Sequence, residues 1–392
     1  MRRTTLLTSL FLMASGVAGP AQDSGQEVAE LELPSNSQIS RIKIFPGQKI
    51  YALSYSTARL LVFDVAGNPV RTIDLQENRP VDVKFYFFDF YVDAAGKAYV
   101  LAVWRPRGNE IRSGVFEYGA DGEFVRLVPF DKHVDGRRLV VDAEGNLLVL
   151  GLDTDLYFGR ADRLGLAHRY DSEGRYLGAF LTLDWEDYAP PATPSIQAAY
   201  HTLRPLVDRL PLSIDETGRV ATVLPGTTTV MFFGGKTLAS RSSAELPVSP
   251  IALTQLPPPG GRFTGETEQI IKLQVNRDRI IAEVSEDRRF QGPPTIHTGR
   301  ALQFFERSES NRLLHAEPST PEFGTLVEQV GTPTDDITCE NRLFFRVWHL
   351  SPEREAAGPV TTPVLLPVCT TENHSPMDRQ GSWSGAVNWR PE

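Results

Sequence analysis

The stretch Leu139-Val140-Val141-Asp142-Ala143-Glu144-Gly145-Asn146-Leu147-Leu148-Val149-Leu150 decides the fold. Two apolar runs flank a turn of the form Asp-x-x-Gly. The aspartate side chain can bond back to the turn backbone, and the glycine can adopt a positive φ. A four-residue connection of this kind closes an antiparallel hairpin. The same unit recurs around Gly96 and Gly218. The chain is therefore predicted to consist of repeated β-hairpins.

A second hairpin type, with an aromatic residue before the turn, alternates with the first. Its copies turn at Gly67, Gly122 and Gly174, which lie 55 and 52 residues apart (122 − 67 and 174 − 122). The repeating unit is therefore four strands long. Four-stranded units with a period of ~40–50 residues are the signature of a β-propeller. The sequence predicts an all-β fold, a six-bladed β-propeller of four-stranded antiparallel blades.

The order of the hairpins assigns the blades. An alternating segment at 28–33 is expected to be a strand that completes the last blade. The first five blades are expected at 42–75, 87–128, 138–183, 212–240 and 271–315, and the sixth at 337–368. In the sixth blade, Pro363 and Pro367 favour an edge position. Seven blades would result if 241–268 contained further strands.

Residues 58–224 resemble the NHL-like six-bladed propellers that are common in secreted bacterial proteins. This resemblance concerns architecture, because propellers of this kind include binding proteins, lactonases, lyases and scaffolds. Propeller lyases and lactonases hold a metal at the central channel on His, Glu, Asn or Asp side chains from several blades. The seven histidines of this chain show no two-residue metal spacing and no H-E-x-x-H motif.

The N-terminus has the pattern of a secretory signal peptide. Arg2 and Arg3 precede an apolar segment at 6–17, and small residues near Ala18 and Ala21 suit cleavage. The segment is shorter than the ~20 residues of a membrane span. Residues 1–21 are therefore expected to be removed and the protein to be secreted or periplasmic. The rest is expected to form one propeller domain at 22–371 with a tail at 372–392.

The charge of the chain restricts its partners. The full sequence carries a net charge of −9, and removal of two arginines leaves 38 basic against 49 acidic residues, or −11. An acidic surface argues against nucleic acid, whose binding depends on clustered Lys and Arg. No second apolar run is long enough to span a bilayer. The expected partner of this monomer is a protein, peptide or glycan.

The strand order places the turns and the loops on opposite faces. In an up-and-down blade the first and third strands run in the same direction. The Asp-x-x-Gly turns therefore gather on one face, here called the turn face. The longer connections gather on the other, here called the loop face, where binding groups are usually found. These connections are expected at 104–113, 151–165, 184–209, 241–268, 285–299 and 316–335.

The connection at 184–209 is predicted to contain a short helix near 194–210. Thr193 and Pro194 resemble an N-cap followed by proline at the first helical position. Apolar residues follow at helical spacing, and Pro205 is expected to break or kink the helix. One interpretation is a lid or specificity element. The other is a helix that covers the channel mouth and buries Leu203 and Leu206.

Ten residues of the predicted loop face combine charges of both signs with aromatic surface, as expected of a recognition site. Trp185 and Tyr188 are expected to form its aromatic part, and Arg105 and Arg107 its charged part. For Trp104 and its neighbouring arginines, the alternative to ligand binding is an arginine that stacks on Trp104 only for packing. The full set is Trp104, Arg105, Arg107, Asp153, Asp155, Trp185, Asp187, Tyr188, His201 and Arg204.

No cofactor is expected, although one group of acids suggests a cation. Asp153, Asp155 and Asp162 could supply oxygen ligands to calcium or another divalent ion. The remaining ligand spacing of a known calcium loop is missing, and solvated loop acids are the alternative. The repeated turn aspartates are better explained by backbone geometry.

Cys339 and Cys369 are the only cysteines. In an exported chain an even number of cysteines favours pairing. A disulfide between them is therefore predicted within the sixth blade, and two buried free thiols are the alternative.

Two functions remain open. The first is a secreted propeller without catalytic activity that presents its loop face to a ligand. The second is an enzyme, a metal-assisted lactonase, hydrolase or lyase with its site at the mouth of the central channel. The missing ligand spacing favours binding.

Overall fold

The computed structural model describes most of the chain between residues 26 and 350. The described ranges are 26–32, 39–45, 49–64, 67–77, 83–106, 111–157, 163–192, 194–215, 217–249, 262–276, 279–291, 296–307, 313–315, 324–329 and 342–350. The predicted signal peptide, the tail at 372–392, the proposed strand region 360–368 and both cysteines lie outside the described residues.

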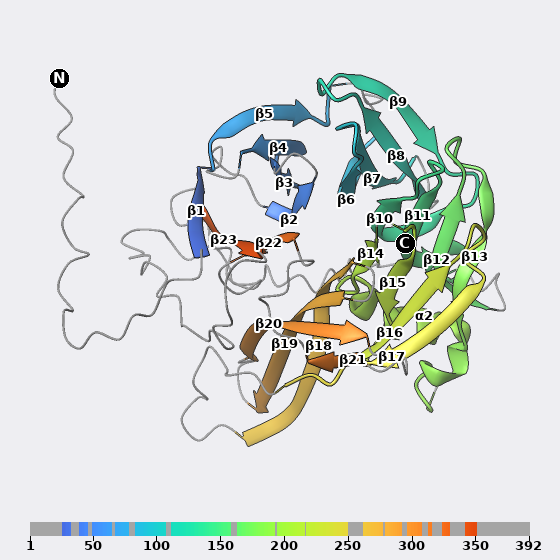
Figure 1. The fold of residues 1–392 in the computed structure, drawn as a ribbon. Helices are drawn as coiled ribbons and strands as arrows, with labels where there is room; N and C mark the ends of the chain where they lie inside the picture. The colour runs from blue at the N-terminus through green and yellow to red at the C-terminus, as the bar shows by residue number, and fades with distance from the viewer. Residues whose placement is uncertain are drawn as a thin grey trace, which may run out of the picture.

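Within the described ranges, five four-stranded antiparallel sheets follow one another, each in simple up-and-down order (Figure 1). Blade one is β2 (Ile39–Phe45), β3 (Lys49–Ser54), β4 (Arg59–Phe63) and β5 (Pro69–Asp74), and blade two is β6 (Phe85–Val92), β7 (Ala98–Trp104), β8 (Arg112–Tyr118) and β9 (Phe124–Pro129). Blade three is β10 (Val134–Val141), β11 (Leu147–Asp153), β12 (Leu164–Tyr170) and β13 (Tyr176–Leu183). Blade four is β14 (Leu212–Ile214), β15 (Val220–Val223), β16 (Thr229–Gly234) and β17 (Ser240–Glu245), and blade five is β18 (Arg262–Asn276), β19 (Arg279–Gln291), β20 (Ile296–Arg307) and β21 (Leu313–His315).

A sixth sheet joins the two ends of the described chain. The N-terminal strand β1 (Gln26–Glu32) pairs antiparallel with β23 (Arg342–Leu350), which also pairs with β22 (Gly324–Gln329). The prediction that an N-terminal strand completes the last sheet is confirmed. Only three strands of this sheet are described, so a sixth four-stranded blade stays a prediction.

The first strands of the sheets surround a common axis. Contacts run from β22 to β2, from β2 to β6, and onward through β10 and β14 to β18 (Figure 1). These inner strands place the sheets radially, face against face. The predicted all-β propeller of four-stranded antiparallel blades is thereby confirmed.

Strands such as β7 and β11 are apolar on both faces of their sheet because a neighbouring blade packs against each face. Every residue of β7 and of β11 is buried. Phe90 and Phe116 lie in the core between blades one and two, and Tyr170 lies in the core between blades two and three. Continuous apolar runs in the sequence therefore reflect packing between neighbouring sheets.

The Asp-x-x-Gly turns have the predicted geometry. Asp142 Oδ1 accepts hydrogen bonds from the backbone N–H groups of Glu144 at 2.9 Å and Asn146 at 2.8 Å. The turn glycine, Gly145, has a φ of +80°, which only glycine adopts readily. The same pair of bonds forms at three further aspartates, Asp93, Asp171 and Asp215.

We expect Asp142→Ala to lower the free energy of unfolding by about 1–2 kcal/mol, because two backbone donors lose their acceptor. Urea denaturation monitored by circular dichroism measures this change. Glu144→Ala in the same turn is the matched control, since this side chain is about half exposed. Equal effects of the two substitutions would show that the aspartate does not organise the turn.

Two arginines of the outer strands join neighbouring blades at equivalent positions. Arg71 of β5 donates to the carbonyl oxygen of Ala120 at 2.5 Å. Arg126 of β9 donates to the carbonyl oxygen of Ser172 at 2.9 Å. Each acceptor lies two residues before the glycine of the next blade's outer turn. The equivalent position of blade three is Gly178, which has no side chain to make this bond.

Among the described residues, one long helix and two short ones interrupt the sheets. They are α1 (Thr154–Tyr157), the 3-10 helix η1 (Trp185–Asp187) and α2 (Ile196–Val207). The predicted helix near 194–210 is confirmed, but its start is shifted. Ser195 is the N-cap and accepts from the N–H of Ala198 at 3.1 Å. Pro205 lies within the helix, which continues to Val207.

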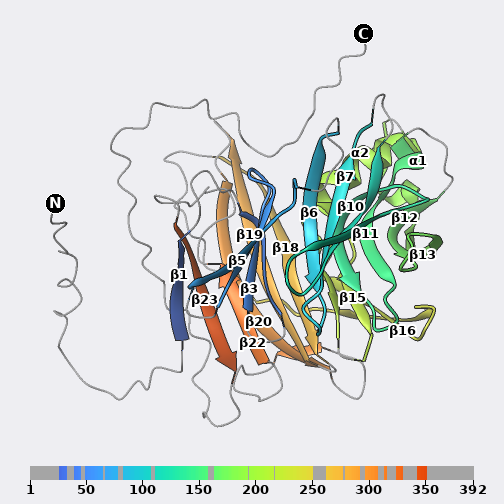
Figure 2. The same ribbon diagram turned by 90° about the horizontal axis from the view of Figure 1, so that it is seen from above.

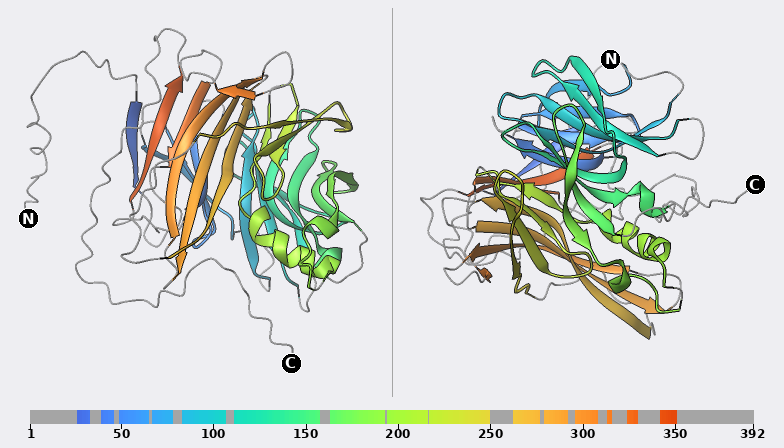
Figure 3. Two further views of the ribbon diagram at one scale, coloured as in Figure 1. Left: turned by 90° about the horizontal axis from the view of Figure 1, so that it is seen from below. Right: turned by 90° about the vertical axis from the view of Figure 1, so that its right-hand side faces the viewer.

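Segments predicted as loops in the C-terminal part contain strands. β19 and β20 occupy most of 285–299, β22 lies within 316–335, and β18 begins within 241–268. The long strands of blade five are visible in Figure 3. Their charged ends are paired across the hairpin, as between Arg288 and Glu266 at 3.3 Å. Such cross-strand ion pairs support strands that have no apolar alternation. In the region predicted as the sixth blade, β23 pairs with β22 and β1.

Candidate functional site

Four inner strands share an irregularity at the same level. Their register shifts before Arg41 in β2, Asp89 in β6, Arg138 in β10 and Lys272 in β18. A β-bulge redirects the side chains beside it and is common next to functional sites. In each of these strands the residue after the shift is charged. At this repeated position Asp89 and Arg138 are buried, whereas Arg41 and Lys272 are half-buried.

Asp89 connects the inner strands of three blades. Its carboxylate lies 2.6 Å from the ammonium group of Lys43 in β2 and accepts from the backbone N–H of Leu139 in β10 at 2.9 Å. The side chain of Asp89 is 1% exposed, and that of Lys43 is 27% exposed. A buried ion pair with further hydrogen bonds is costly to break on one side.

Three arginines meet at Asp208, directly after α2. Arg138 donates to the Asp208 carbonyl oxygen at 2.7 Å, and Arg41 contacts the same oxygen at 3.4 Å. The guanidinium of Arg137 pairs with the Asp208 carboxylate and stacks 4.2 Å from the ring centre of Phe88. We call Arg41, Lys43, Asp89, Arg137, Arg138 and Asp208 the axial cluster. None of these six residues is among the ten predicted site residues.

A second set of contacts holds α2 to β10. The carboxylate of Asp135 is 6% exposed and receives Arg137 at 2.9 Å. It also receives the hydroxyl of Tyr200 and the guanidinium of Arg204, each at 3.3 Å. Burial, followed by the charge of Asp135, raises the pKa of Tyr200. The phenol therefore stays a hydrogen-bond donor.

The segment after α2 lies across one end of the axis. Asp208 contacts blades one and three, and Arg209 reaches Gln269 at 3.1 Å and Asp287 at 3.4 Å in blade five. Leu203 is fully buried beneath the helix and Leu206 is half-buried. Of the two interpretations of this helix, the geometry favours a cover over the channel mouth.

Seven of the ten predicted site residues lie together. α2 contacts both α1 and η1, and α1 follows directly on β11 (Figure 2). We call this group of three helices the helical cap. The residues that it gathers are Asp153, Asp155, Trp185, Asp187, Tyr188, His201 and Arg204. Asp187 and His201 are exposed, whereas Trp185 and Tyr188 are half-buried against the core of blades three to five.

Of the remaining three predicted residues, Trp104 and Arg105 lie at the end of β7 and not in the cap. Trp104, at the end of β7, is 7% exposed and packs 5.1 Å from the ring of Phe85. This burial assigns Trp104 to the core between blades one and two, and its role in binding stays a prediction. Arg105 is half-buried beside it. Arg107 lies outside the described residues.

The predicted calcium ligands are engaged differently. The carboxylate of Asp153 lies 2.6 Å from the ammonium group of Lys132 and accepts from the N–H of Asp155 at 2.9 Å. Asp162 lies outside the described residues. In the described part of the chain, no group of three or more His, Cys, Asp or Glu side chains could hold a metal ion.

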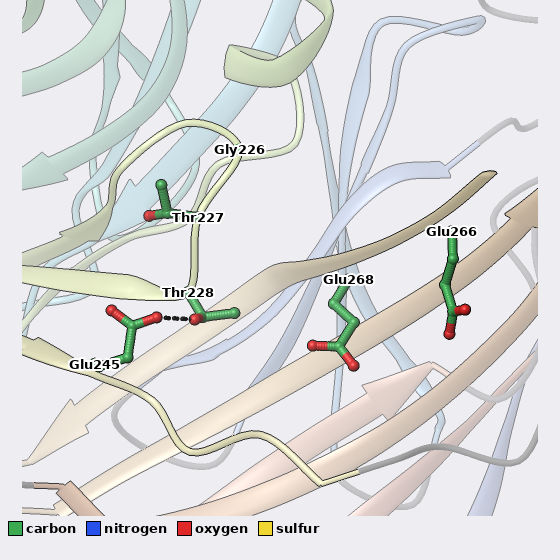
Figure 4. A pocket seen from close by; sticks show the side chains of 6 residues that line it. All are labelled: Gly226, Thr227, Thr228, Glu245, Glu266 and Glu268. Carbon is green, nitrogen blue, oxygen red and sulfur yellow. Dashed lines mark hydrogen bonds between the residues drawn. The ribbon is translucent and has the colours of Figure 1, made fainter.

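A polar groove of about 460 Å³ lies between blades four and five (Figure 4). It is lined by Gly226, Thr227, Thr228, Glu245, Glu266 and Glu268. Thr228 donates to Glu245, and Glu266 pairs with Arg288 at 3.3 Å. The groove is acidic and contains no predicted site residue. Its sign is opposite to that of the axial cluster.

Charge is unevenly matched in the axial cluster. Lys43 and Arg137 face carboxylates, whereas Arg41 and Arg138 have no carboxylate partner among the described residues and donate to backbone carbonyl oxygens. Burial lowers the pKa of Arg138 to about 9, and the charge of Arg41 acts in the same direction. Burial also lowers the pKa of Arg41. The pair therefore carries excess positive charge.

No protein-family model matches the sequence, and no curated protein matches it. Among solved structures, the chain is similar to a putative exported protein from Bacteroides fragilis, with 10% identity, a TM-score of 0.43, and coverage of 83% of this chain and 95% of that one. It is also similar to a streptogramin B lyase, with 10% identity, a TM-score of 0.35, and coverage of 74% and 86%. A third similar structure is the extracellular domain of a one-component system from B. thetaiotaomicron, with 12% identity, a TM-score of 0.38, and coverage of 80% and 34%.

None of the helices in the described ranges is both long and apolar enough to cross a membrane.

Proposed function

We propose that this protein is a secreted or periplasmic binding module that takes up a protein, peptide or glycan ligand through its loop face, at the helical cap. One observation carries this proposal. Two separate connections, β11–β12 and β13–β14, place exposed charge and half-buried aromatic rings side by side, on a support fixed to the inner strand β10 through Asp135. Polar groups beside aromatic surface on a rigid scaffold are typical of recognition sites.

The turn face is the less suitable surface. The side-chain oxygens of its aspartates accept hydrogen bonds from backbone N–H groups of their own turns, as at Asp93 and Asp215. Side chains used in this way have little left to offer a ligand. No feature of the described residues favours the alternative of a metal-assisted lactonase, hydrolase or lyase over binding.

The proposal extends to the parts of the chain outside the described residues. Residues 1–21 act as a signal peptide, and the mature protein is a monomer. A sixth blade closes the ring around β1, β22 and β23, as in NHL-like propellers. Cys339 and Cys369 form a disulfide that braces this closure, which thiol titration of the denatured, unreduced protein would detect as the absence of free thiols.

Ligand-induced protection from hydrogen exchange tests the assignment of the faces. The full chain would be screened by thermal shift against acidic, neutral and basic oligosaccharides and peptides, and each hit would be followed by exchange mass spectrometry. We expect protection at 153–157, 185–188 and 197–204, and none at the turns around Gly96, Gly145 and Gly218. His201→Ala and Asp187→Ala should weaken binding, whereas Glu144→Ala on the turn face should not. Protection confined to the turns would refute the proposal.

A further inference from the structure

We propose that Arg41 and Arg138 form an oxyanion-binding pair at the axis, which receives the acidic group of a ligand. This inference rests on the proposed binding function and names the chemistry of one part of the ligand. Arginine suits this role because its planar fork of donors matches carboxylate, sulfate and phosphate groups.

The described carboxylates of the axial region have other partners. Asp89 receives Lys43 and the N–H of Leu139, and the side chain of Asp208 pairs with Arg137. Asp135 receives Arg137, Arg204 and Tyr200. Asp89 and Asp208 act on Arg41 and Arg138 at longer range, but no described carboxylate forms an ion pair with either arginine. Because a buried charge without a counter-charge is destabilising, an external anion would be bound favourably.

The two arginines converge on one point. Both contact the carbonyl oxygen of Asp208, Arg138 at 2.7 Å and Arg41 at 3.4 Å. Donors that already share one oxygen acceptor are close enough to share the oxygens of one small anion. Their placement is fixed by the register shifts in β2 and β10, which bring equivalent positions of two blades to the same level.

Unused hydrogen-bond donors lie at the same place. Arg41 Nε and Arg137 Nη1 are buried and have no hydrogen-bond partner in the described part of the protein. The whole Arg137 residue is 5% exposed. A buried donor without a partner in a native structure calls for an explanation, and a missing ion is one. The contact between Arg41 and Asp208 is exposed to solvent, so an ion can reach this point.

The test measures binding of defined oxyanions to the full chain. Acetate and galacturonate probe carboxylate recognition, sulfate and phosphate probe the other oxyanions, and chloride at matched ionic strength and galactose are the controls. We expect at least one oxyanion to raise the melting temperature and to bind by calorimetry. Arg41→Gln and Arg138→Gln should each weaken that binding by ~10-fold or more, the scale for losing a charge-assisted donor. Arg175→Gln, an exposed arginine on the turn face, should leave it unchanged.

The stability of the unliganded variants gives a second readout. If the pair carries uncompensated charge, Arg138→Gln should keep or raise the melting temperature in chloride. A fall of several degrees would show that Arg138 serves only to hold the end of α2, and would overturn the proposal. Oxyanion effects that equal those of chloride, or that persist in both variants, would overturn it as well. Binding of neutral or basic ligands at the helical cap without any oxyanion effect would refute this pair while leaving the proposed function intact.

Discussion

Replacing Asp89 by alanine is expected to lower the free energy of unfolding by about 3–5 kcal/mol, the range for removing one partner of a buried ion pair. The substitution leaves Lys43 without its carboxylate and the N–H of Leu139 without its acceptor. It also removes a negative charge that acts on Arg41 and Arg138. Equilibrium denaturation in urea at neutral pH would measure the loss.

Two further variants make this result specific. Asp89→Asn keeps an acceptor for Leu139 but not the charge, so its effect should lie between those of alanine and the wild type. Asp74→Ala removes the acid of an exposed pair, in which Arg59 and Asp74 are 3.9 Å apart and each about 40% exposed. This control should change stability by less than about 1 kcal/mol. An equally small change at Asp89 would mean that the axial cluster does not support the fold.

The architecture was predictable because it depends on local signals. Each Asp-x-x-Gly turn satisfies its own backbone within five residues, as the bonds from Asp142 to Glu144 and Asn146 show. Apolar runs on either side then define the strands. The same reasoning fails in blade five, where ion pairs such as Lys272 with Glu283 at 2.9 Å support strands that contain many charged residues. Their charge made 285–299 resemble a surface loop.

The seven site residues that the helical cap gathers were predicted from their types and their place in long connections, whereas no residue of the axial cluster was predicted as a site residue. Trp185, Tyr188 and His201 stood out as aromatic and polar residues in a long insertion. Arg41 and Asp208 meet across 167 positions of sequence, which no local pattern reveals. One signal was nevertheless present. Asp89 and Arg138 each lie four residues before a turn aspartate, and Asp89 is the only charged residue of its strand. A charge repeated at one position of a buried strand indicates a shared site.

Trp104 shows the limit of residue type as evidence. Tryptophan beside arginine at a strand end is common in binding sites, and it is equally suited to cover a core edge. The contact with Phe85 assigns it to the core between blades one and two. Only the burial of the Trp104 side chain separates a binding role from a packing role. This burial depends on contacts with the neighbouring blade, which the local sequence does not show.

His168 is expected to make the fold sensitive to acid. Its ring is fully buried in β12, with Nε2 3.2 Å from the carbonyl oxygen of Gly151 and Nδ1 3.4 Å from the hydroxyl of Tyr176. A carbonyl oxygen only accepts, so the neutral ring donates from Nε2 and accepts at Nδ1. Burial lowers the pKa of His168 from 6.5 to about 4, with Asp153 acting to raise it and Lys132 acting to lower it.

The sign of the pH effect follows from this shift. Between pH 6.5 and 4 the unfolded chain binds a proton that the folded protein does not. Stability from this group is therefore complete above pH 6.5 and is lost as the pH falls toward 4. At about 1.4 kcal/mol per pH unit, the total loss is about 3 kcal/mol. Urea denaturation at intervals between pH 7.5 and 4 would record it.

Two variants make the assignment to His168 specific. His168→Gln can make both hydrogen bonds without titrating, so it should remove the contribution of His168 to the dependence of stability on pH. His201→Gln, on the exposed face of α2, should leave that contribution in place. The same slope in His168→Gln and wild type would show that other groups cause the acid sensitivity.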